Sequence, residues 1–422
     1  MARTRCALIV VATLAVALAP AGAAPATGPL DPIEQVEIGP NREFRVNGEP
    51  FLPIMSWAQG SGSYGMLRSL GFNTFCGGGR SGEAAGAAKA AGGYLIPDFT
   101  RTLIGNPSVL AWIHGDEPDM PQRRQQAATP DQIEGQGGAR PRGSEPKRPA
   151  AEVQEHYRNI KQADPSRPVL VTFTGHFFEK IRSHYTAEQQ ATLYRQYIQG
   201  ADVVGFDIYP IYGHGRPGWL NHPADAVAQL TKMAGPRPVY AWIETSKGSR
   251  WMSYERQPDV LPMHTRFQVW GALINGATAI GYFTHAWAPT FKEFAPTDEM
   301  RAELLRINSQ MTRLAPAILA APARTAVTMT MSDGLPCQFK ATTHDGSLYL
   351  FAQNRDLGPN SENLGQFDPI SPRGGTATFT VAGMKAGTTI EVVDENRTLT
   401  AADGGFTDAF GPLAEHIYKI AQ

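Results

Sequence analysis

Eight short apolar segments between residues 50 and 285 place the strongest constraint on the fold of this chain. Each is apolar almost throughout rather than alternating, which indicates strands that are buried on both faces, as in a parallel sheet. Stretches of helical character separate the segments, and eight such units predict a (β/α)8 barrel. The segments are Phe51–Trp57, Phe72–Phe75, Tyr94–Phe99, Val109–Glu117, Pro168–Gly175, Val203–Pro210, Val239–Thr245 and Ala279–His285.

The segments beside these strands fit the same architecture. Residues Ala151–Ala163 place apolar residues on one helical face and end before Asp164-Pro165, which is a helix-stop signal. Residues Arg266–Asn275 are apolar nearly all round, as in a helix packed between a barrel and its neighbours. Before the first strand, residues 36–51 alternate around an Asn47-Gly48 turn, which predicts a β-hairpin across the bottom of the barrel.

Two regions depart from the repeat. Residues 119–150 are rich in Gln, Gly, Pro and Arg without an apolar period, which predicts a long surface loop after strand four. From about Ala323 the apolar period becomes two, with Gly and Asn turns, which predicts an all-β sandwich over residues 323–422. The predicted domains are therefore a barrel over residues 24–318, including the hairpin, and a C-terminal sandwich.

The first 23 residues resemble an export signal. Arg3 and Arg5 precede the apolar run Ala7–Leu18, and small residues follow at positions 21–23. No later stretch approaches the roughly 20 apolar residues of a membrane-spanning helix. We therefore expect a secreted or periplasmic protein that has no membrane partner after the signal is removed.

Composition excludes several functional classes. The chain has 38 basic and 39 acidic residues, a net charge of −1, so no basic field is available for nucleic acid. The spacing of His and Cys predicts no metal site, no G-x-S-x-G motif occurs, and we expect no cofactor. The glycine-rich stretch Cys76–Gly86 lacks a nucleotide-binding pattern and is interpreted as a flexible rim loop. Cys76 and Cys337 are expected to be free, buried thiols.

Acidic residues fall at the expected carboxyl ends of the strands, where the chemistry of a (β/α)8 barrel takes place. They are Asp98, Asp116, Glu117, Asp207 and Glu244. Glu117 closes strand four and Glu244 closes strand seven. For these two the structural alternatives are a helix-capping turn and a strand-end salt bridge, whereas Asp98 and Asp207 are equally well explained as loop anchors.

Two glutamates at the ends of strands four and seven resemble the clan A retaining glycoside hydrolases. The motifs that carry the resemblance span nearly the whole mature chain: FRVNGEPFLPIMSW, LGFNTF, VLAWIHGDEPD, ADVVGFDIYPIY, RPVYAWIE, RFQVWGALINGATAIGYF, and a β-rich tail from LYLFAQN to HIYKI. The resemblance implies that Glu117 is the acid/base and Glu244 the nucleophile of a double displacement on a β-linked carbohydrate. Their carboxyl groups would then lie about 5–5.5 Å apart.

Asp116 stands where the commonest pattern of that superfamily has an asparagine that contacts the 2-hydroxyl of the sugar. Its negative charge is expected to favour the protonated form of Glu117, and its carboxylate can accept a hydrogen bond from that hydroxyl. Asp119 is interpreted as a helix or loop cap.

Further substrate-binding candidates lie on the same rim. The resemblance implies a hydrogen bond from Tyr209 to the nucleophile, and Trp287 is a candidate platform for a sugar ring. Trp57, His176 and His285 complete the set, and ordinary packing is the alternative for each of the five. Two alternative functions stay open: a carbohydrate-binding barrel without catalysis, and a transglycosylase that uses the same pair.

Overall fold

The structure is a computed structural model that describes residues 28–79, 81–122, 145–181 and 183–422. The predicted export signal lies outside these residues. Eight parallel strands form one sheet in the order β6-β5-β4-β13-β12-β11-β10-β7. Their bounds follow the eight predicted segments closely: β4 Ile54–Trp57, β5 Thr74–Cys76, β6 Tyr94–Ile96, β7 Trp112–Ile113, β10 Val169–Thr174, β11 Val203–Asp207, β12 Val239–Glu244 and β13 Ala279–Phe283.

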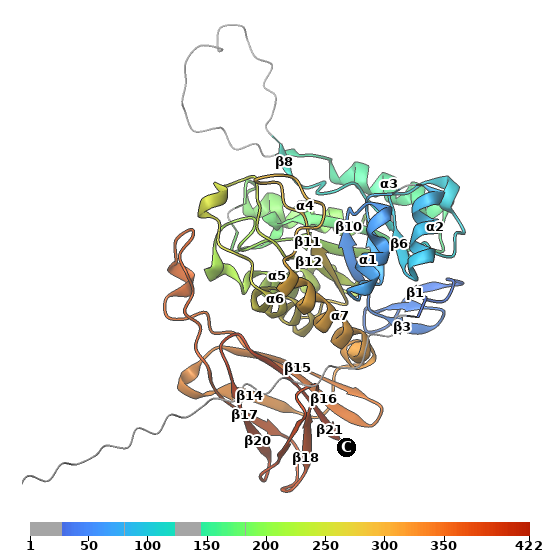
Figure 1. The fold of residues 1–422 in the computed structure, drawn as a ribbon. Coiled ribbons are helices and arrows are strands. Elements are labelled where there is room, and N and C mark those ends of the chain that lie inside the picture. Colours follow the sequence, from blue (N-terminus) through green and yellow to red (C-terminus); the bar gives the residue numbers. More distant parts are fainter. Residues whose placement is uncertain (1–27, 80, 123–144, 182) are drawn as a thin grey trace, which may run out of the picture.

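Isolated parallel bridges join the two ends of this sheet. They pair Leu95 with Val109 and Asp98 with Ile113, so β6 meets β7 and the barrel closes. The fourth predicted strand is the one that differs most from expectation, because only Trp112–Ile113 of its nine residues form a regular ladder, with β10. The predicted (β/α)8 barrel is confirmed (Figure 1).

Large aromatic side chains of β12 fill the barrel interior. Tyr240 bonds Thr172 two strands away, and Trp242 packs against Trp57 with ring centroids 5.0 Å apart. Two glycines on the flanking strands make room for them: a Cβ on Gly205 would lie 2.3 Å from the Tyr240 ring, and one on Gly281 would lie 2.1 Å from Trp242. The glycines of β11 and β13 therefore have a packing function.

Helices cover the outside of the barrel in six of the seven connections between its strands, and α7 follows the last strand. The connection between β6 and β7 holds only the single 3-10 turn Arg101–Leu103. The two helices that the sequence predicts over residues 151–163 and 266–275 are present as α3 and α6. The bounds are α1 Tyr64–Ser69, α2 Gly82–Ala91, α3 Ala150–Ala163, α4 Ala187–Ile198, α5 His222–Ala234, α6 Pro262–Ile274 and α7 Asp298–Ile318.

The glycine-rich stretch Cys76–Gly86 is not the loop that the sequence suggests. Its second half is the first turn of α2, where the Ser81 hydroxyl accepts a bond from the Ala84 N–H at 3.3 Å. The interpretation was wrong because small residues there serve close packing: Ala84, Ala85 and Ala88 are all buried.

The long connection after β7 is paired at its base. Strands β8 (Pro121–Gln122) and β9 (Glu145–Pro146) form a short antiparallel ladder, which the sequence did not predict. Residues 123–144 of the predicted loop lie outside the described residues.

Before the barrel, the predicted hairpin is present with an additional strand. Strands β1 (Val36–Ile38), β2 (Phe44–Val46) and β3 (Glu49–Phe51) form a three-stranded antiparallel sheet. Asn47 and Gly48 join β2 to β3 with φ values of +52° and +87°, as a type I′ turn requires.

The C-terminal part is the predicted β-sandwich. A three-stranded sheet, β14-β17-β20, faces a five-stranded sheet, β15-β16-β21-β18-β19, across a separate apolar core. Cys337 in β15 is free but only half-buried, whereas the free Cys76 is buried as expected. The bounds are β14 Val327–Met331, β15 Cys337–His344, β16 Ser347–Asn354, β17 Gly375–Val381, β18 Thr389–Val392, β19 Arg397–Thr400, β20 Gly405–Phe410 and β21 Glu415–Ala421.

The sandwich packs against the helical side of the barrel, beside α5, α6 and α7 (Figure 1). Trp270 of α6 stacks on Phe351 with ring centroids 6.0 Å apart, and Gln353 donates to the Phe267 carbonyl at 2.9 Å. A loop of the sandwich also reaches the segment after β11, where the Phe367 N–H donates to Gly215 at 2.6 Å. Among the described residues, no helix combines the length and apolar character needed to cross a bilayer.

Candidate active site

Carboxyl groups converge at the carboxyl ends of β7 and β11. Glu117 and Asp207 are each half-buried, and their side chains are in hydrogen-bonding contact. Asp116 and Asp98 contribute further negative charge beside them. Two carboxyl groups in hydrogen-bonding contact cannot both ionise at low cost, so the pair is expected to share one proton near neutral pH.

The backbone at Glu117 is strained. Its φ of +48° lies in the left-handed region, which a non-glycine residue rarely adopts, and Pro118 restricts this conformation further. The turn is closed by the Met120 N–H, which donates to the Glu117 carbonyl at 3.1 Å. Strain of this kind concentrates at functional sites, and here it turns the Glu117 side chain toward Asp207.

Burial and neighbouring charge both favour the protonated acids. Burial is the main cause that raises the pKa of Glu117 to about 7; the contact with Asp207 lowers it, and the charges of Asp116 and Asp119 raise it. Burial and then the Glu117 and Asp116 charges raise the pKa of Asp207 well above its ordinary value. The Oδ1 oxygen of Asp207 is buried and has no hydrogen-bond partner. The pair can therefore hold a transferable proton at neutral pH.

The charge of Asp116 raises the pKa of Glu117, in the direction that the sequence predicts. Burial raises the pKa of Asp116 itself to about 6, Lys147 lowers it, and Asp98 raises it. The Lys147 ammonium donates to the Asp116 carbonyl at 2.8 Å, which ties the base of the long connection to the rim.

Asp119 is more than the cap that the sequence suggests. It is completely buried, and it accepts hydrogen bonds from the Thr174 N–H at 2.9 Å, the Thr174 hydroxyl at 2.6 Å and the Tyr194 hydroxyl at 2.6 Å. The Tyr185 hydroxyl donates to its carbonyl at 2.7 Å. These bonds fix the turn that follows Glu117 against β10 and α4.

Glu244 does not join this cluster. It is completely buried, and its carboxylate accepts bonds from the Ile211 N–H at 3.1 Å, the Tyr212 N–H at 2.6 Å and the Gln268 side chain at 3.0 Å. Burial raises its pKa to about 7, against the lowering effect of these three donors. The carboxylate faces the β11 connection and α6, and Glu117 is not among the groups that shift its pKa.

The remaining substrate-binding candidates are Tyr209, beside the acidic cluster, and four residues elsewhere on the rim. Tyr209 is buried beside the acidic cluster, since the charges of Asp207, Asp116 and Glu117 all raise its pKa. The donors on Glu244 come from Ile211, Tyr212 and Gln268, so the predicted Tyr209 bond to Glu244 is not formed.

Trp57, His285 and Trp287 lie at the ends of the neighbouring strands β4 and β13. Trp57 packs on the barrel interior, whereas His285 is buried and stacks on Trp287 with centroids 6.4 Å apart. Trp287 is 40% exposed, as a sugar platform requires. His176 is separate from them: it packs against His184, and burial lowers its pKa to about 4.

Sequence reasoning missed two features of this face. Asp207 was weighed as a loop anchor because nothing local to strand six indicates a carboxyl partner; only the closed barrel brings it to Glu117. Arg250, Trp251 and Phe291 lie in the loops after β12 and β13, and no local sequence pattern distinguishes them.

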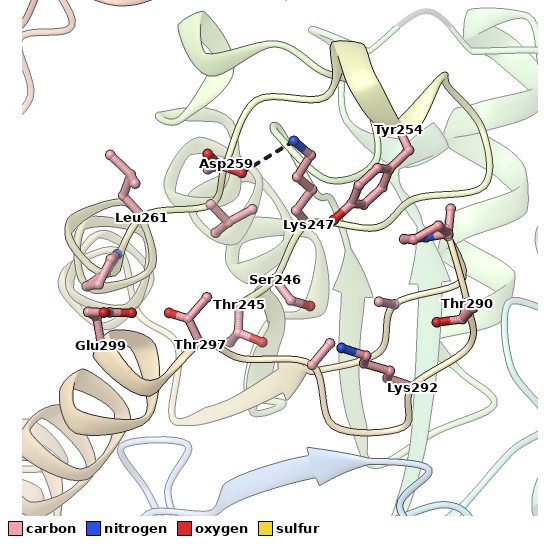
Figure 2. Close-up of a pocket in the computed structure, with 16 residues that line it drawn as sticks. Thr245, Ser246, Lys247, Tyr254, Asp259, Leu261, Thr290, Lys292, Thr297 and Glu299 are labelled. Atoms are coloured by element: carbon pink, nitrogen blue, oxygen red, sulfur yellow. Dashed lines mark ion pairs between the residues drawn. The ribbon is translucent and has the colours of Figure 1, made fainter.

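A cavity of about 570 Å³ lies beyond the end of β12 (Figure 2). Its lining includes Thr245, Ser246, Lys247 and Lys292, and Lys247 forms an ion pair with Asp259 at 3.5 Å. None of the acidic residues of the β7 and β11 ends lines it. In the part of the chain that the structure describes, no group of three or more His, Cys, Asp or Glu residues is placed to hold a metal ion.

Comparison with known proteins gives similarity in fold. No protein-family model and no curated protein matches the sequence. The α-amylase from Geobacillus thermoleovorans, solved with acarbose, has a TM-score of 0.52 at 10% identity, over 92% of this chain and all of that one. The chain is a (β/α)8 barrel with a C-terminal β-sandwich.

Two further solved structures have lower TM-scores. A putative α-galactosidase/melibiase from Bacteroides fragilis has a TM-score of 0.47 at 11% identity, over 87% of this chain and 79% of that one. The family 51 α-L-arabinofuranosidase AbfB from Bifidobacterium longum has 0.46 at 12% identity, over 92% and 97%. At these identities the likeness concerns the fold alone.

Proposed function

We propose that this protein hydrolyses glycosidic bonds, with Glu117 and Asp207 as the catalytic carboxyl pair. The observation that carries the proposal is the contact between these two half-buried side chains at the carboxyl ends of two barrel strands. Active sites of (β/α)8 enzymes are built at this end of the barrel, and glycoside hydrolysis requires two carboxyl groups. A barrel shared with an α-amylase supports the same reaction class.

Glu117 is assigned as the proton donor. Its pKa of about 7 keeps much of it protonated at neutral pH, and Asp116 and Asp119 favour that state. In the reaction, the proton passes to the glycosidic oxygen as the bond from that oxygen to the anomeric carbon breaks. Water supplies the new hydroxyl group at the anomeric carbon, and its proton returns to the carboxyl pair, so the acid is regenerated.

Asp207 is assigned as the second carboxylate, in place of Glu244. The two carboxyl groups are in contact in this structure. A bound sugar would have to separate them to the roughly 5–9.5 Å that glycosidases require, and Asp207 would then face the positive charge of an oxocarbenium-like transition state. For Glu244 to act on a sugar, its carboxylate would have to break its hydrogen bonds to three donors and become exposed. Glu244 is instead a positioning residue, which holds the segment that carries Tyr209 and Tyr212.

The test is hydrolysis of a panel of α- and β-linked 4-nitrophenyl glycosides and soluble polysaccharides. The panel holds both linkages because the sequence predicts a β-linked substrate, whereas the similar amylase fold does not distinguish α from β. Release of reducing sugar or nitrophenol that is lost in Asp207→Asn supports the proposal. No hydrolysis of any substrate at pH 4–8 by folded protein would overturn it. Export remains a prediction, which fractionation of the source cells would test.

A further inference from the structure

The outer rim of the barrel carries exposed aromatic side chains beside the acidic cluster. Trp251 is 59% exposed, Phe291 54% and Trp287 40%. Large apolar residues are usually withdrawn from solvent, and a group of them on one surface marks a binding site. The other exposed large apolar residues of the described chain are aliphatic: Met66, Ile104, Met233 and Leu261.

Ring contacts connect this rim to the proposed active site. Tyr209, beside the acids, contacts Tyr212 with centroids 6.0 Å apart, and Tyr212 meets Trp251 edge-on at 6.0 Å. On the other side Trp287 and Phe291 lie 4.9 Å apart. The exposed rings therefore pack on buried rings, Tyr209 and Tyr212, that reach the carboxyl pair.

The loop that displays Trp251 is held rigidly. The buried side chain of Gln257 accepts from the Gly248 and Ser249 N–H groups, both at 3.0 Å, and donates to the Ser249 carbonyl at 2.7 Å. The Gly248 carbonyl in turn accepts from the Trp287 N–H at 2.7 Å, which joins the two loops. Aromatic side chains fixed in place while exposed lose little entropy when a ligand binds.

Arg250 provides polar groups between the rings. Its guanidinium lies 4.9 Å from the Trp287 ring centroid and 5.9 Å from that of Trp251. Arg250 is exposed, and no hydrogen-bond acceptor or carboxylate partner occupies its donors among the described residues. A sugar ring has apolar faces and a rim of hydroxyl oxygens. The aromatic rings can stack on its apolar faces, and the free N–H donors of Arg250 can bind its hydroxyl oxygens.

We propose that Arg250, Trp251 and Phe291 form a subsite for a sugar unit beyond the cleaved bond, so that the substrate is a glycan chain rather than a small glycoside. This inference rests on the proposed function, since it extends from the same site. The alternative occupant, another protein, would not require continuity with the carboxyl pair.

The experiment measures binding without turnover. Asp207→Asn protein is run in native gels that contain barley β-glucan, arabinoxylan, galactomannan, polygalacturonate or soluble starch. We expect retardation by at least one polymer, and a rise of about tenfold in the dissociation constant when Trp251→Ala or Phe291→Ala is added. Met233→Ala, which removes a similarly exposed apolar side chain from α5, is the matched control and should bind normally.

Two results would overturn the inference: no retardation in any of the five gels, or equal retardation with and without both rings. Unfolding curves confirm that each variant is folded. Failure here is distinct from failure of the proposed function, because hydrolysis of 4-nitrophenyl monoglycosides needs no subsite beyond the cleaved bond and is measured separately in the wild-type protein.

Discussion

Glu117 and Glu244 close two strands of the same barrel, and both have a pKa of about 7 for different reasons. Around Glu117, the negative charges of Asp116 and Asp119 add to the effect of burial. Around Glu244, burial alone raises the pKa, and three hydrogen-bond donors oppose it. The same pKa therefore belongs to a proton donor at the end of β7, Glu117, and to a buried hydrogen-bond acceptor at the end of β12, Glu244.

The difference teaches that a carboxylate at a strand end is not by itself a catalytic group. What separates the two is the second acidic group: Glu117 has Asp207 in contact, whereas Glu244 has Ile211, Tyr212 and Gln268. A perturbed pKa marks a functional site when its causes include a specific charged partner.

The largest expected effect concerns turnover. Glu117→Gln should lower kcat/KM by roughly 10²–10⁴-fold on substrates with poor leaving groups, because no proton is available for the departing oxygen. Nitrophenyl glycosides with low leaving-group pKa should be much less affected. Asp207→Asn should be slow with every leaving group. The opposite pattern in the two variants would contradict this assignment, because it would make Asp207 the proton donor and Glu117 the second carboxylate.

Glu244 should show its effect in stability. Glu244→Gln places an amide where three donors converge, and Glu244→Ala leaves all three without a partner; a loss of about 2–4 kcal/mol in the free energy of unfolding is expected. Urea denaturation measures it. Glu117→Gln is the matched control and should show no such loss, because it removes a carboxyl group whose pKa is raised in the folded state. Wild-type stability in both Glu244 variants would contradict the role assigned to its hydrogen bonds.

Asp207→Asn should alter the pH dependence of stability. The pKa of Asp207 is raised in the folded state, so its contribution is present below its unfolded pKa of about 4 and is lost as the pH rises toward and beyond neutrality. Asparagine does not titrate. The variant should therefore gain stability relative to wild type as the pH rises from 4 to 8, measured by denaturation at each pH. A difference that does not change with pH would argue against a buried pair.

The smallest effect belongs to Asp119. Its charge raises the pKa of Glu117, so Asp119→Asn should move the basic limb of the pH–rate profile down by less than about one pH unit. Tyr194→Phe removes one of its hydrogen bonds but no charge and should leave that limb in place. An unshifted limb in Asp119→Asn would remove Asp119 from the tuning of Glu117.

The sequence predicts the barrel well because burial on both faces leaves a local pattern: β10, β11, β12 and β13 each lie within a predicted segment. It predicts Glu117 for the same reason, since an acid that ends an apolar strand is visible locally. The surroundings of Glu244 depend on distant contacts. Alternation with Tyr240 and Trp242 suggests that Glu244 points into the barrel, but free N–H groups after β11 and Gln268 of α6 bind its carboxylate instead. The contact of Glu117 with Asp207 likewise exists only once the barrel closes.

The central claim, that Glu117 and Asp207 share a proton, is tested most directly by NMR titration of protein labelled with ¹³C at the glutamate carboxyl carbons. The Glu117 resonance, assigned by its loss in Glu117→Gln, should titrate near pH 7 in wild type and show a second step from its partner. In Asp207→Asn it should titrate in a single step. A single step near the ordinary glutamate pKa, unchanged by Asp207→Asn, would contradict the account.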